Sequence, residues 1–258
     1  MSTEATGLYN VVWTAWYLAF MQVHRRYVGS FIGVLWTLVN PIMRVLVLYM
    51  VFTYIFPCNI PHFLGYLFFG ILAWDFLAAS CTTASQSLYN RSTVLSCCTV
   101  PRYMFVLVDV FSEFINFLLA LSAAMVFVYT TDLPFPLSAF LLPVVLLPLF
   151  FFSVGMGLLL ANVGVRFRDV THMLGVLFQF AFWFTPLAYK TELAPRALRL
   201  IARYNPLWWV IRPVREALYD GTFPDLPVFL LAAGAAALAL GLGLLAERRL
   251  GPYSVLYQ

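Results

Sequence analysis

The sequence predicts an all-α integral membrane protein with six transmembrane helices. Of its 258 residues, 63% are hydrophobic and only 10% are charged, against roughly 25% charged residues in an ordinary soluble domain. A helix needs about 20 mainly apolar residues to cross the hydrocarbon core of a bilayer, and six runs of suitable length leave little room for a soluble domain. The predicted spans cover residues 31–56, 63–84, 103–129, 139–163, 170–189 and 226–246.

Arginines recur on one side of this six-span plan. Cytoplasmic loops of membrane proteins collect Lys and Arg, so both termini are expected in the cytoplasm, and the first span is expected to act as its own insertion signal. The outer segment 190–225 is an exception, because it carries six basic residues beside four acids. The arginines on the predicted inner side are Arg25, Arg26, Arg91, Arg102, Arg166, Arg168, Arg248 and Arg249.

Two regions outside the spans have helical patterns. Residues 8–28 predict an interfacial amphipathic helix, which either anchors the first span or supports a partner at the membrane surface. Segment 190–225 divides at Asn205-Pro206 into two helical pieces, each too short to span. In the first piece, the arginine face is expected to meet water or headgroups, while the other face packs on the spans. The first face holds Arg196, Arg199 and Arg203, and the second holds Leu200, Ile201 and Tyr204.

No catalytic or metal-binding pattern is present in the sequence. A phosphate-binding P-loop needs a lysine between glycine and Ser or Thr, and Lys190, the single lysine, lies in Tyr-Lys-Thr. Any nucleotide hydrolysis must therefore come from a second polypeptide. Three scattered histidines and four cysteines lack metal-ligand or redox spacing. Neither a metal, nor a cofactor, nor a nucleic-acid partner is expected for this chain.

Four charged residues fall within predicted spans, where charge is costly and marks functional candidates. They are Arg44, Asp75, Asp109 and Glu113. Asp109 and Glu113 are four residues apart and Asn116 lies one turn further, so the three form a polar stripe on one helical face. The stripe could carry protons, but it stops before mid-membrane. Hydrogen bonding between helices is favoured instead, with Arg44 as a candidate partner for one of the acids.

Four sequence pieces resemble ABC-2-type permeases, above all exporters of O-antigen, capsule and teichoic acid. The run 25–36 (RRYVGSFIGVLW), with Pro41 after it, resembles the start of the first span in that family, although Val28 stands where a basic residue is common. Three further pieces agree in order and spacing over nearly the whole chain. They are Arg166-Phe167-Arg168-Asp169, Phe184-Thr185-Pro186 and Asn205-Pro206-Leu207.

The resemblance implies a homodimer of permease subunits around a channel, driven by two copies of a cytoplasmic ATPase that binds ATP and Mg. By position, residues 87–98 match the region that contacts the ATPase, and residues 190–220 match outer gate helices. The alternative for residues 87–98 is a solvated connection between spans, and the alternative for residues 190–220 is a static outer cap. The coupling candidates are Ser87, Leu88, Tyr89, Asn90 and Arg91; the gate candidates are Arg196, Arg199, Arg203, Asn205 and Pro206.

Aromatic residues make up 18% of the chain and suit a lipid-linked polysaccharide substrate. Sugars present axial C–H groups that pack against aromatic faces, and a sliding polymer needs many weak contacts. The alternative is that these side chains face membrane lipid. The channel-lining candidates are Trp36, Tyr49, Phe178, Phe182 and Trp183.

The favoured function is therefore polysaccharide export across the inner membrane of a bacterium. Within transport, the alternative is an ABC-2 exporter of a small lipid or drug. Outside that class, the alternatives are a membrane enzyme acting on a lipid-linked sugar, and a proton-coupled carrier that uses Asp109 and Glu113. The sequence does not distinguish capsule, O-antigen and teichoic acid.

Overall fold

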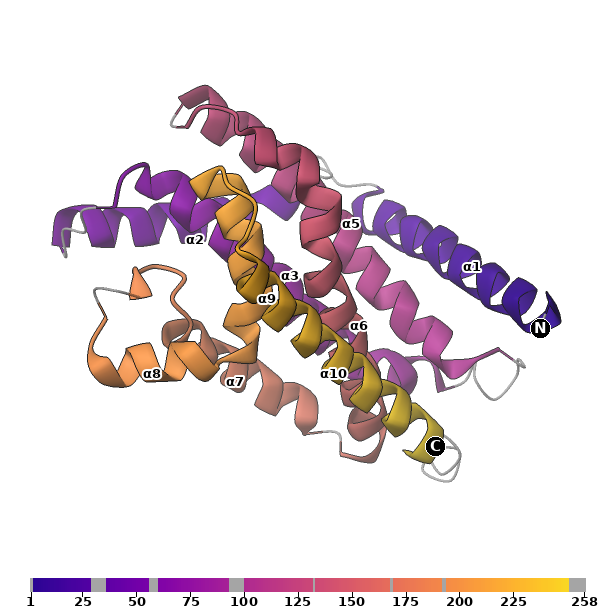
Figure 1. The fold of residues 1–258 in the computed structure, drawn as a ribbon. Helices are drawn as coiled ribbons and strands as arrows, with labels where there is room; N and C mark the ends of the chain where they lie inside the picture. The colour runs from indigo at the N-terminus through magenta and orange to yellow at the C-terminus, as the bar shows by residue number, and fades with distance from the viewer. Residues whose placement is uncertain are drawn as a thin grey trace.

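In the computed structural model, every regular element of the described residues is a helix (Figure 1). The structure describes residues 2–28, 36–55, 60–92, 100–131, 133–167, 169–191 and 194–250. The long helices are α1 (Ser2–Tyr27), α3 (Phe63–Asn90), α5 (Arg102–Thr131), α6 (Leu142–Arg166) and α10 (Leu226–Leu250). The shorter elements are α2 (Trp36–Met50), η2 (Val51–Ile55), η3 (Leu137–Leu141), α7 (Val170–Phe184), α8 (Arg196–Tyr204), α9 (Pro206–Arg215) and η5 (Glu216–Asp220).

Four helical stretches, in α3, α5, η3 with α6, and α10, are long and apolar enough to cross a membrane. They coincide with the predicted second, third, fourth and sixth spans and confirm an all-α membrane protein. The second span was expected to end at residue 84, but α3 continues to Asn90, so the start of the predicted coupling region is the last part of a membrane helix.

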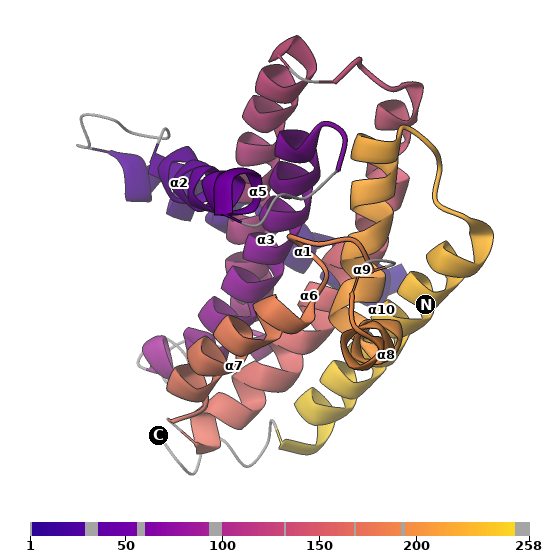
Figure 2. The same cartoon turned by 90° about the vertical axis from the view of Figure 1, so that its left-hand side faces the viewer.

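The helices at the predicted first and fifth spans are shorter. Each of α2 and α7 has 15 residues, a length of about 22 Å against a hydrocarbon core of about 30 Å. A π-helical turn, η2, extends α2 to Ile55, and both views show α2 inclined to the long helices (Figures 1 and 2). Because Pro186 disfavours helical geometry at the preceding residue, Thr185 is extended and ends α7. The six-span count therefore stays a prediction.

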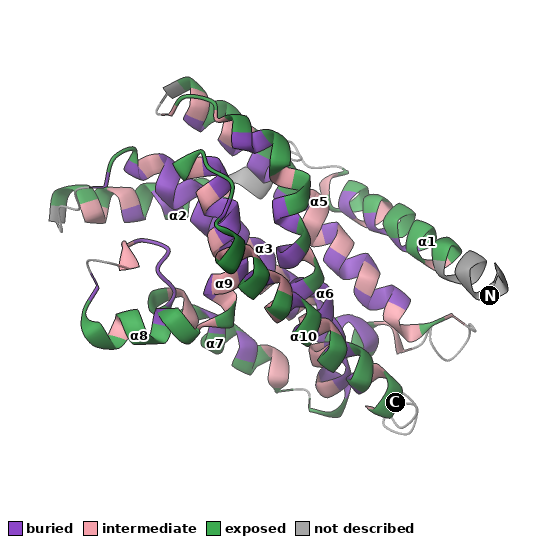
Figure 3. Cartoon of the chain, in the orientation of Figure 1, coloured by how far each residue is buried: buried purple, intermediate pink, exposed green. Residues whose placement is uncertain are grey.

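The core is centred on α3, which is buried along most of its length (Figure 3). Glycines let α6 approach its neighbours backbone to backbone. A Cβ on Gly155 would lie 2.3 Å from the carbonyl carbon of Ala239 in α10, and a Cβ on Gly164 would lie 2.2 Å from the carbonyl oxygen of Ser85 in α3. Small residues at such contacts are typical of helix pairs in membranes.

The N-terminal helix α1 begins before the predicted residue 8 and lies along α5 (Figure 1). Ala15 and Ala19 are buried in a small cluster with residues of α5 that include Phe105. Trp13 and Phe20 remain exposed. The helix thus has one face on the protein and one aromatic face outside, as a helix in the membrane interface requires; its position in a membrane stays a prediction.

Candidate functional site

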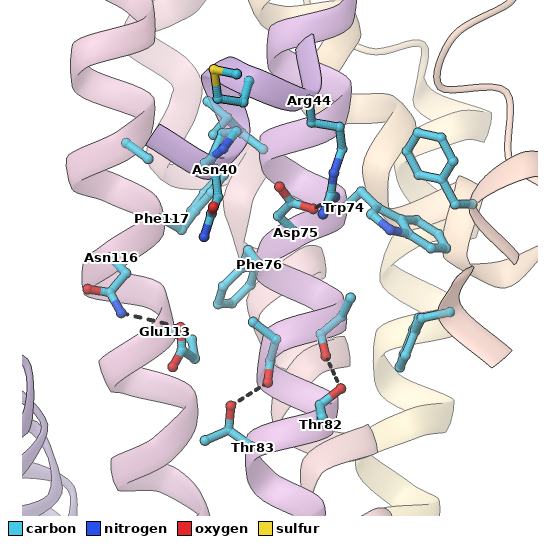
Figure 4. Close-up of a pocket in the computed structure, with 18 of the residues that line it drawn as sticks. Asn40, Arg44, Trp74, Asp75, Phe76, Thr82, Thr83, Glu113, Asn116 and Phe117 are labelled. Atoms are coloured by element: carbon cyan, nitrogen blue, oxygen red, sulfur yellow. Dashed lines mark hydrogen bonds and ion pairs between the residues drawn. The ribbon is translucent and has the colours of Figure 1, made fainter. Parts of the chain in front are cut away.

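A cleft of about 1280 Å³ opens between α2, α3, α5 and α7. Figure 4 shows it lined by side chains of three kinds. Uncharged polar groups come from Asn40, Thr82, Thr83, Asn116 and Gln179, and charged groups from Arg26, Arg44, Asp75 and Glu113. Aromatic rings come from Tyr27, Trp74, Phe76, Phe117, Phe178, Phe182 and Trp183, and small or aliphatic residues complete the lining.

The aromatic wall of the cleft includes three of the five predicted channel-lining residues. Phe178 and Phe182 of α7 each meet Trp74 edge to face, at centroid distances of 5.8 and 5.9 Å, and Trp183 also lines the cleft. Tyr49 does not line this cleft and packs instead on Phe63, 6.2 Å away.

The side chain of Trp36 lies outside those the structure describes. Sequence analysis missed Trp74, although its position beside the intramembrane Asp75 was a usable signal.

An ion pair crosses the cleft wall between Arg44 of α2 and Asp75 of α3 (Figure 4). The Asp75 side chain is 26% exposed and the Arg44 side chain 46%. A carboxylate placed in a membrane helix is costly unless it is paired, and Arg44 supplies the opposite charge. Arg44, expected as a partner for one of the acids of the α5 stripe, pairs with Asp75 instead, and this ion pair connects α2 to α3.

A second polar cluster, the polar seam, joins α1, α5 and the end of α3. Its members are Gln22, Arg26, Tyr27, Arg91, Asp109, Glu113 and Asn116. At its centre, the Arg91 guanidinium donates to both carboxylate oxygens of Asp109, with both N–O distances 2.7 Å. Gln22 donates to the same carboxylate at 3.1 Å and accepts from Arg91 at 3.1 Å. Three elements therefore share one hydrogen-bonded group.

The outer half of the polar seam, around Glu113 and Asn116, has longer hydrogen bonds than the contact between Arg91 and Asp109. Arg26 donates to Glu113 at 3.1 Å, Tyr27 donates to Asn116 at 3.2 Å, and Asn116 donates to Glu113 at 3.3 Å. The stripe on α5 is thus satisfied by hydrogen bonds between helices, the interpretation favoured from the sequence. Sequence analysis missed the partners on α1, although Gln22 and Arg26 have the same four-residue spacing as Asp109 and Glu113.

Burial distinguishes the two acids of the polar seam. The Asp109 side chain is 2% exposed and that of Arg91 24%. A bidentate guanidinium–carboxylate pair is among the strongest hydrogen-bonded contacts, which offsets the desolvation of both charges. The hydrogen bonds to Asp109 raise the pKa of Arg91, so the arginine keeps its charge.

The predicted coupling residues fall into two groups. Ser87 and Leu88 are buried, whereas Tyr89 and Asn90 are exposed. Arg91 folds back onto the protein, where it also donates to the Ser87 hydroxyl at 2.8 Å. Tyr89 and Asn90 are therefore the exposed members of these five residues. Residues 93–98 of the predicted region lie outside the described part of the chain.

The predicted outer segment contains two short helices, α8 and α9, which meet at Asn205 as expected. The Asn205 carboxamide caps α9 by accepting from the Leu207 amide at 3.0 Å, and it donates to the Thr185 hydroxyl at 2.9 Å. Pro206 occupies the first turn of α9, where its missing amide hydrogen is harmless.

The expected orientation of α8 was wrong for the single chain. Leu200 and Ile201 do not pack on the spans and are 59% and 43% exposed, and Tyr204 is exposed as well. Ala202 is the buried residue of α8, and Arg199 and Arg203 line a cavity. Arg196, Arg199 and Arg203 are all exposed, as expected. The apolar face of α8 is exposed as well, because Ala202 is the one buried residue of this helix.

The fold and the cleft define a helical membrane protein with a partly polar cleft between its helices. Residues 14–219 match the sequence profile of the ABC-2 type transporter, and the chain belongs to this family. It is accordingly a membrane component of a transporter, as the resemblance of its motifs implied.

Three relatives are permeases by name. The chain is 29% identical over 220 residues to the O-antigen export system permease protein RfbA of Myxococcus xanthus, which covers 84% of this chain and 85% of that protein. It is 25% identical over 198 residues to the protein of the same name from Klebsiella pneumoniae, covering 76% of each. A second Klebsiella pneumoniae RfbA is 25% identical over 197 residues, again covering 76% of each.

Proposed function

We propose that the chain is the permease subunit of an ABC exporter that moves a lipid-linked polysaccharide of O-antigen type across the bacterial inner membrane. The observation that carries this proposal is similarity to the Myxococcus xanthus O-antigen export permease over 84% of this chain and 85% of that protein. The proposed arrangement has two permease subunits, two copies of a cytoplasmic ATPase that bind ATP and Mg, and both permease termini in the cytoplasm.

The chemistry of the cleft supports a sugar polymer. Trp74, Phe178, Phe182 and Trp183 offer faces and edges for sugar C–H groups, while amides and hydroxyls on the other elements can exchange hydrogen bonds with sugar hydroxyls. None of these contacts is strong alone, as movement of a chain requires. Because the cleft is open on one side, a second copy of the chain is proposed to complete the channel.

The same geometry weakens the alternatives. A proton-coupled carrier would need Asp109 to be open to the transport path, but its side chain is 2% exposed and both carboxylate oxygens accept from Arg91. A cleft of about 1280 Å³ exceeds the roughly 300–1,000 Å³ of most small-molecule pockets, which favours a polymer over a small drug.

Deletion and complementation test the proposed function. Removing the chain from its native cell should abolish the surface polysaccharide and leave lipid-linked polymer inside, and the wild-type chain should restore export. Normal surface polysaccharide in the deletion strain would contradict the proposal. Loss of a lipid or a drug-resistance phenotype, with the polysaccharide unchanged, would support the small-molecule exporter instead.

Contact with the ATPase is proposed for Tyr89 and Asn90, since these are the exposed coupling residues. In an otherwise cysteine-free chain, N90C should crosslink to a single-cysteine ATPase in the assembled complex. The matched control S87C places the thiol one helical turn away, at a buried site, and should react far less. If neither Y89C nor N90C crosslinks to the ATPase in an intact complex, the ATPase must contact another surface of the chain.

A further inference from the structure

A second cavity, the outer basic cavity, has a volume of about 680 Å³ and lies among α8, α9, η5, the start of α3 and the start of α10. Among the residues that the structure describes, five basic side chains line it against two acidic ones, with aromatic and apolar residues between them. The basic residues are Lys190, Arg199, Arg203, Arg212 and Arg215, and the acidic ones are Glu216 and Asp220. The others are Tyr66, Thr191, Ala202, Trp208, Trp209, Tyr219, Val228 and Leu231.

Arg215 is the buried base of this cavity. Only 8% of it is exposed, and its guanidinium carbon lies 4.2 Å from the ring centre of Tyr66 and 4.3 Å from that of Trp208. It donates to the carbonyl oxygen of Pro186 at 2.8 Å. Burial lowers the pKa of Arg215, because desolvation disfavours its charge. The protein therefore holds a costly cation in a fixed orientation between two aromatic faces.

The other basic residues surround this position from separate elements. Arg199 donates to the carbonyl oxygen of Ala194 at 3.2 Å, and Arg212 pairs with Glu216 at 2.5 Å. The Trp209 indole donates to the carbonyl oxygen of Arg203 at 2.9 Å, which connects α8 to α9 beside the cavity. Positive charge is thus concentrated by the fold rather than spread over an open surface.

We propose that the outer basic cavity binds a phosphate-type anion. Guanidinium groups match phosphate oxygens with pairs of hydrogen bonds, and the described lining brings four guanidinium groups and one ammonium group to a single cavity. Val228 and Leu231 of α10 border the same cavity, so an apolar chain could lie beside the anion. The group is accordingly either the headgroup of a phosphate-bearing lipid or a free phosphate or pyrophosphate.

The position of the cavity also connects it to the wall of the cleft. Pro186, which accepts from Arg215, directly follows Thr185 at the end of α7, and Thr185 is bonded to Asn205 between α8 and α9. An anion in the cavity would therefore stabilise the segment that holds α7, α8 and α9 together. This inference rests on the cavity alone and does not depend on the proposed transport function.

Binding to the purified full-length chain in a maltoside detergent, which carries no phosphate, tests the proposal. Inorganic pyrophosphate and farnesyl pyrophosphate are the probes, titrated by calorimetry without the ATPase. R203Q should weaken binding about tenfold, the usual effect of losing one charged hydrogen bond, and R199Q/R203Q should weaken it further. R196Q is the matched control, because Arg196 is on the same helix outside the cavity, and it should retain wild-type affinity.

The two probes distinguish the sources of the anion. Equal affinity for both, lowered by R203Q, indicates that a free phosphate group suffices. Tighter binding of farnesyl pyrophosphate, again lowered by R203Q, indicates a lipid headgroup. Absence of binding of either probe to the wild-type chain would overturn the proposal, as would equal weakening by R203Q and R196Q. Since neither ATP nor polymer is present, these outcomes are independent of any failure of export.

Discussion

Two helix contacts in this protein use opposite means of association. Between α6 and α10, Gly155 and Gly243 have no side chains, so the backbones of the two helices come into contact. Between α1 and α5, charged and amide side chains form the polar seam, with Arg91 inserted from the end of α3. The first contact depends on shape and the second on directional hydrogen bonds, and both are established ways to join helices in a membrane.

The comparison indicates where the molecule can change. A backbone contact leaves no room for sliding, so α6 and α10 are expected to move as one unit. In the polar seam, Gln22 both donates to Asp109 and accepts from Arg91, so partners can exchange without leaving a charge unpaired. The polar seam also contains Arg91, one of the predicted coupling residues. We therefore expect signals from a partner ATPase to reach α1 and α5 through Arg91.

Filling the backbone contact should have the largest effect. In G155A, the added methyl group would overlap the backbone of Ala239 and Leu240 and should destabilise the chain by about 3 kcal/mol, as overpacking does. The matched control G241A adds the same group to α10 where nothing lies within 4 Å. Thermal unfolding, monitored by size-exclusion chromatography, should show a lower midpoint for G155A than for the wild type, and an unchanged midpoint for G241A. Equal midpoints for the two variants would refute the close contact.

Breaking the centre of the polar seam should have the next largest effect. D109N removes the carboxylate charge but keeps the shape, and leaves Arg91 mostly buried without its anion. We expect a loss of about 2 kcal/mol in stability. The double variant R91Q/D109N should lose less than the sum of the single variants, because the two residues interact directly. Strict additivity in the same unfolding measurement would mean that the pair is not coupled.

The outer half of the polar seam should matter least. E113Q removes an ion pair in which Arg26 is 42% exposed, and exposed pairs contribute about 0.5 kcal/mol. Its unfolding midpoint should therefore lie close to that of the wild type, well above that of D109N. A loss as large as that of D109N would show that the seam acts as one unit rather than as a buried centre with a weaker rim.

Much of the fold follows from the sequence, because long apolar runs have few structural solutions. The four longest spans and the division at Asn205-Pro206 both depend on length and local chemistry. The end of α3 did not follow, since the segment 85–90 is polar yet remains helical and partly buried, with Ser85 hydrogen-bonded to Thr171 of α7 and close to Gly164 of α6. Packing, rather than composition, extends that helix.

The site was less predictable, since side-chain partners depend on tertiary contacts. Asp109 was identified as costly and in need of a partner, but nothing local indicated Arg91 from 18 residues away or Gln22 from 87. The aromatic residues of α7 were identified by their density, whereas the exposure of Leu200 and Ile201 did not follow from the amphipathic pattern of α8.

ATP-dependent movement of polymer across a membrane tests the central claim most directly. The chain and its ATPase would be reconstituted into vesicles with the ATP-binding side outside, and labelled lipid-linked polysaccharide added with or without ATP. We predict that ATP drives the label into a compartment protected from added glycosidase, and that the chain alone neither hydrolyses ATP nor moves the label. Hydrolysis by the isolated chain, or movement that persists without ATP, would contradict the account.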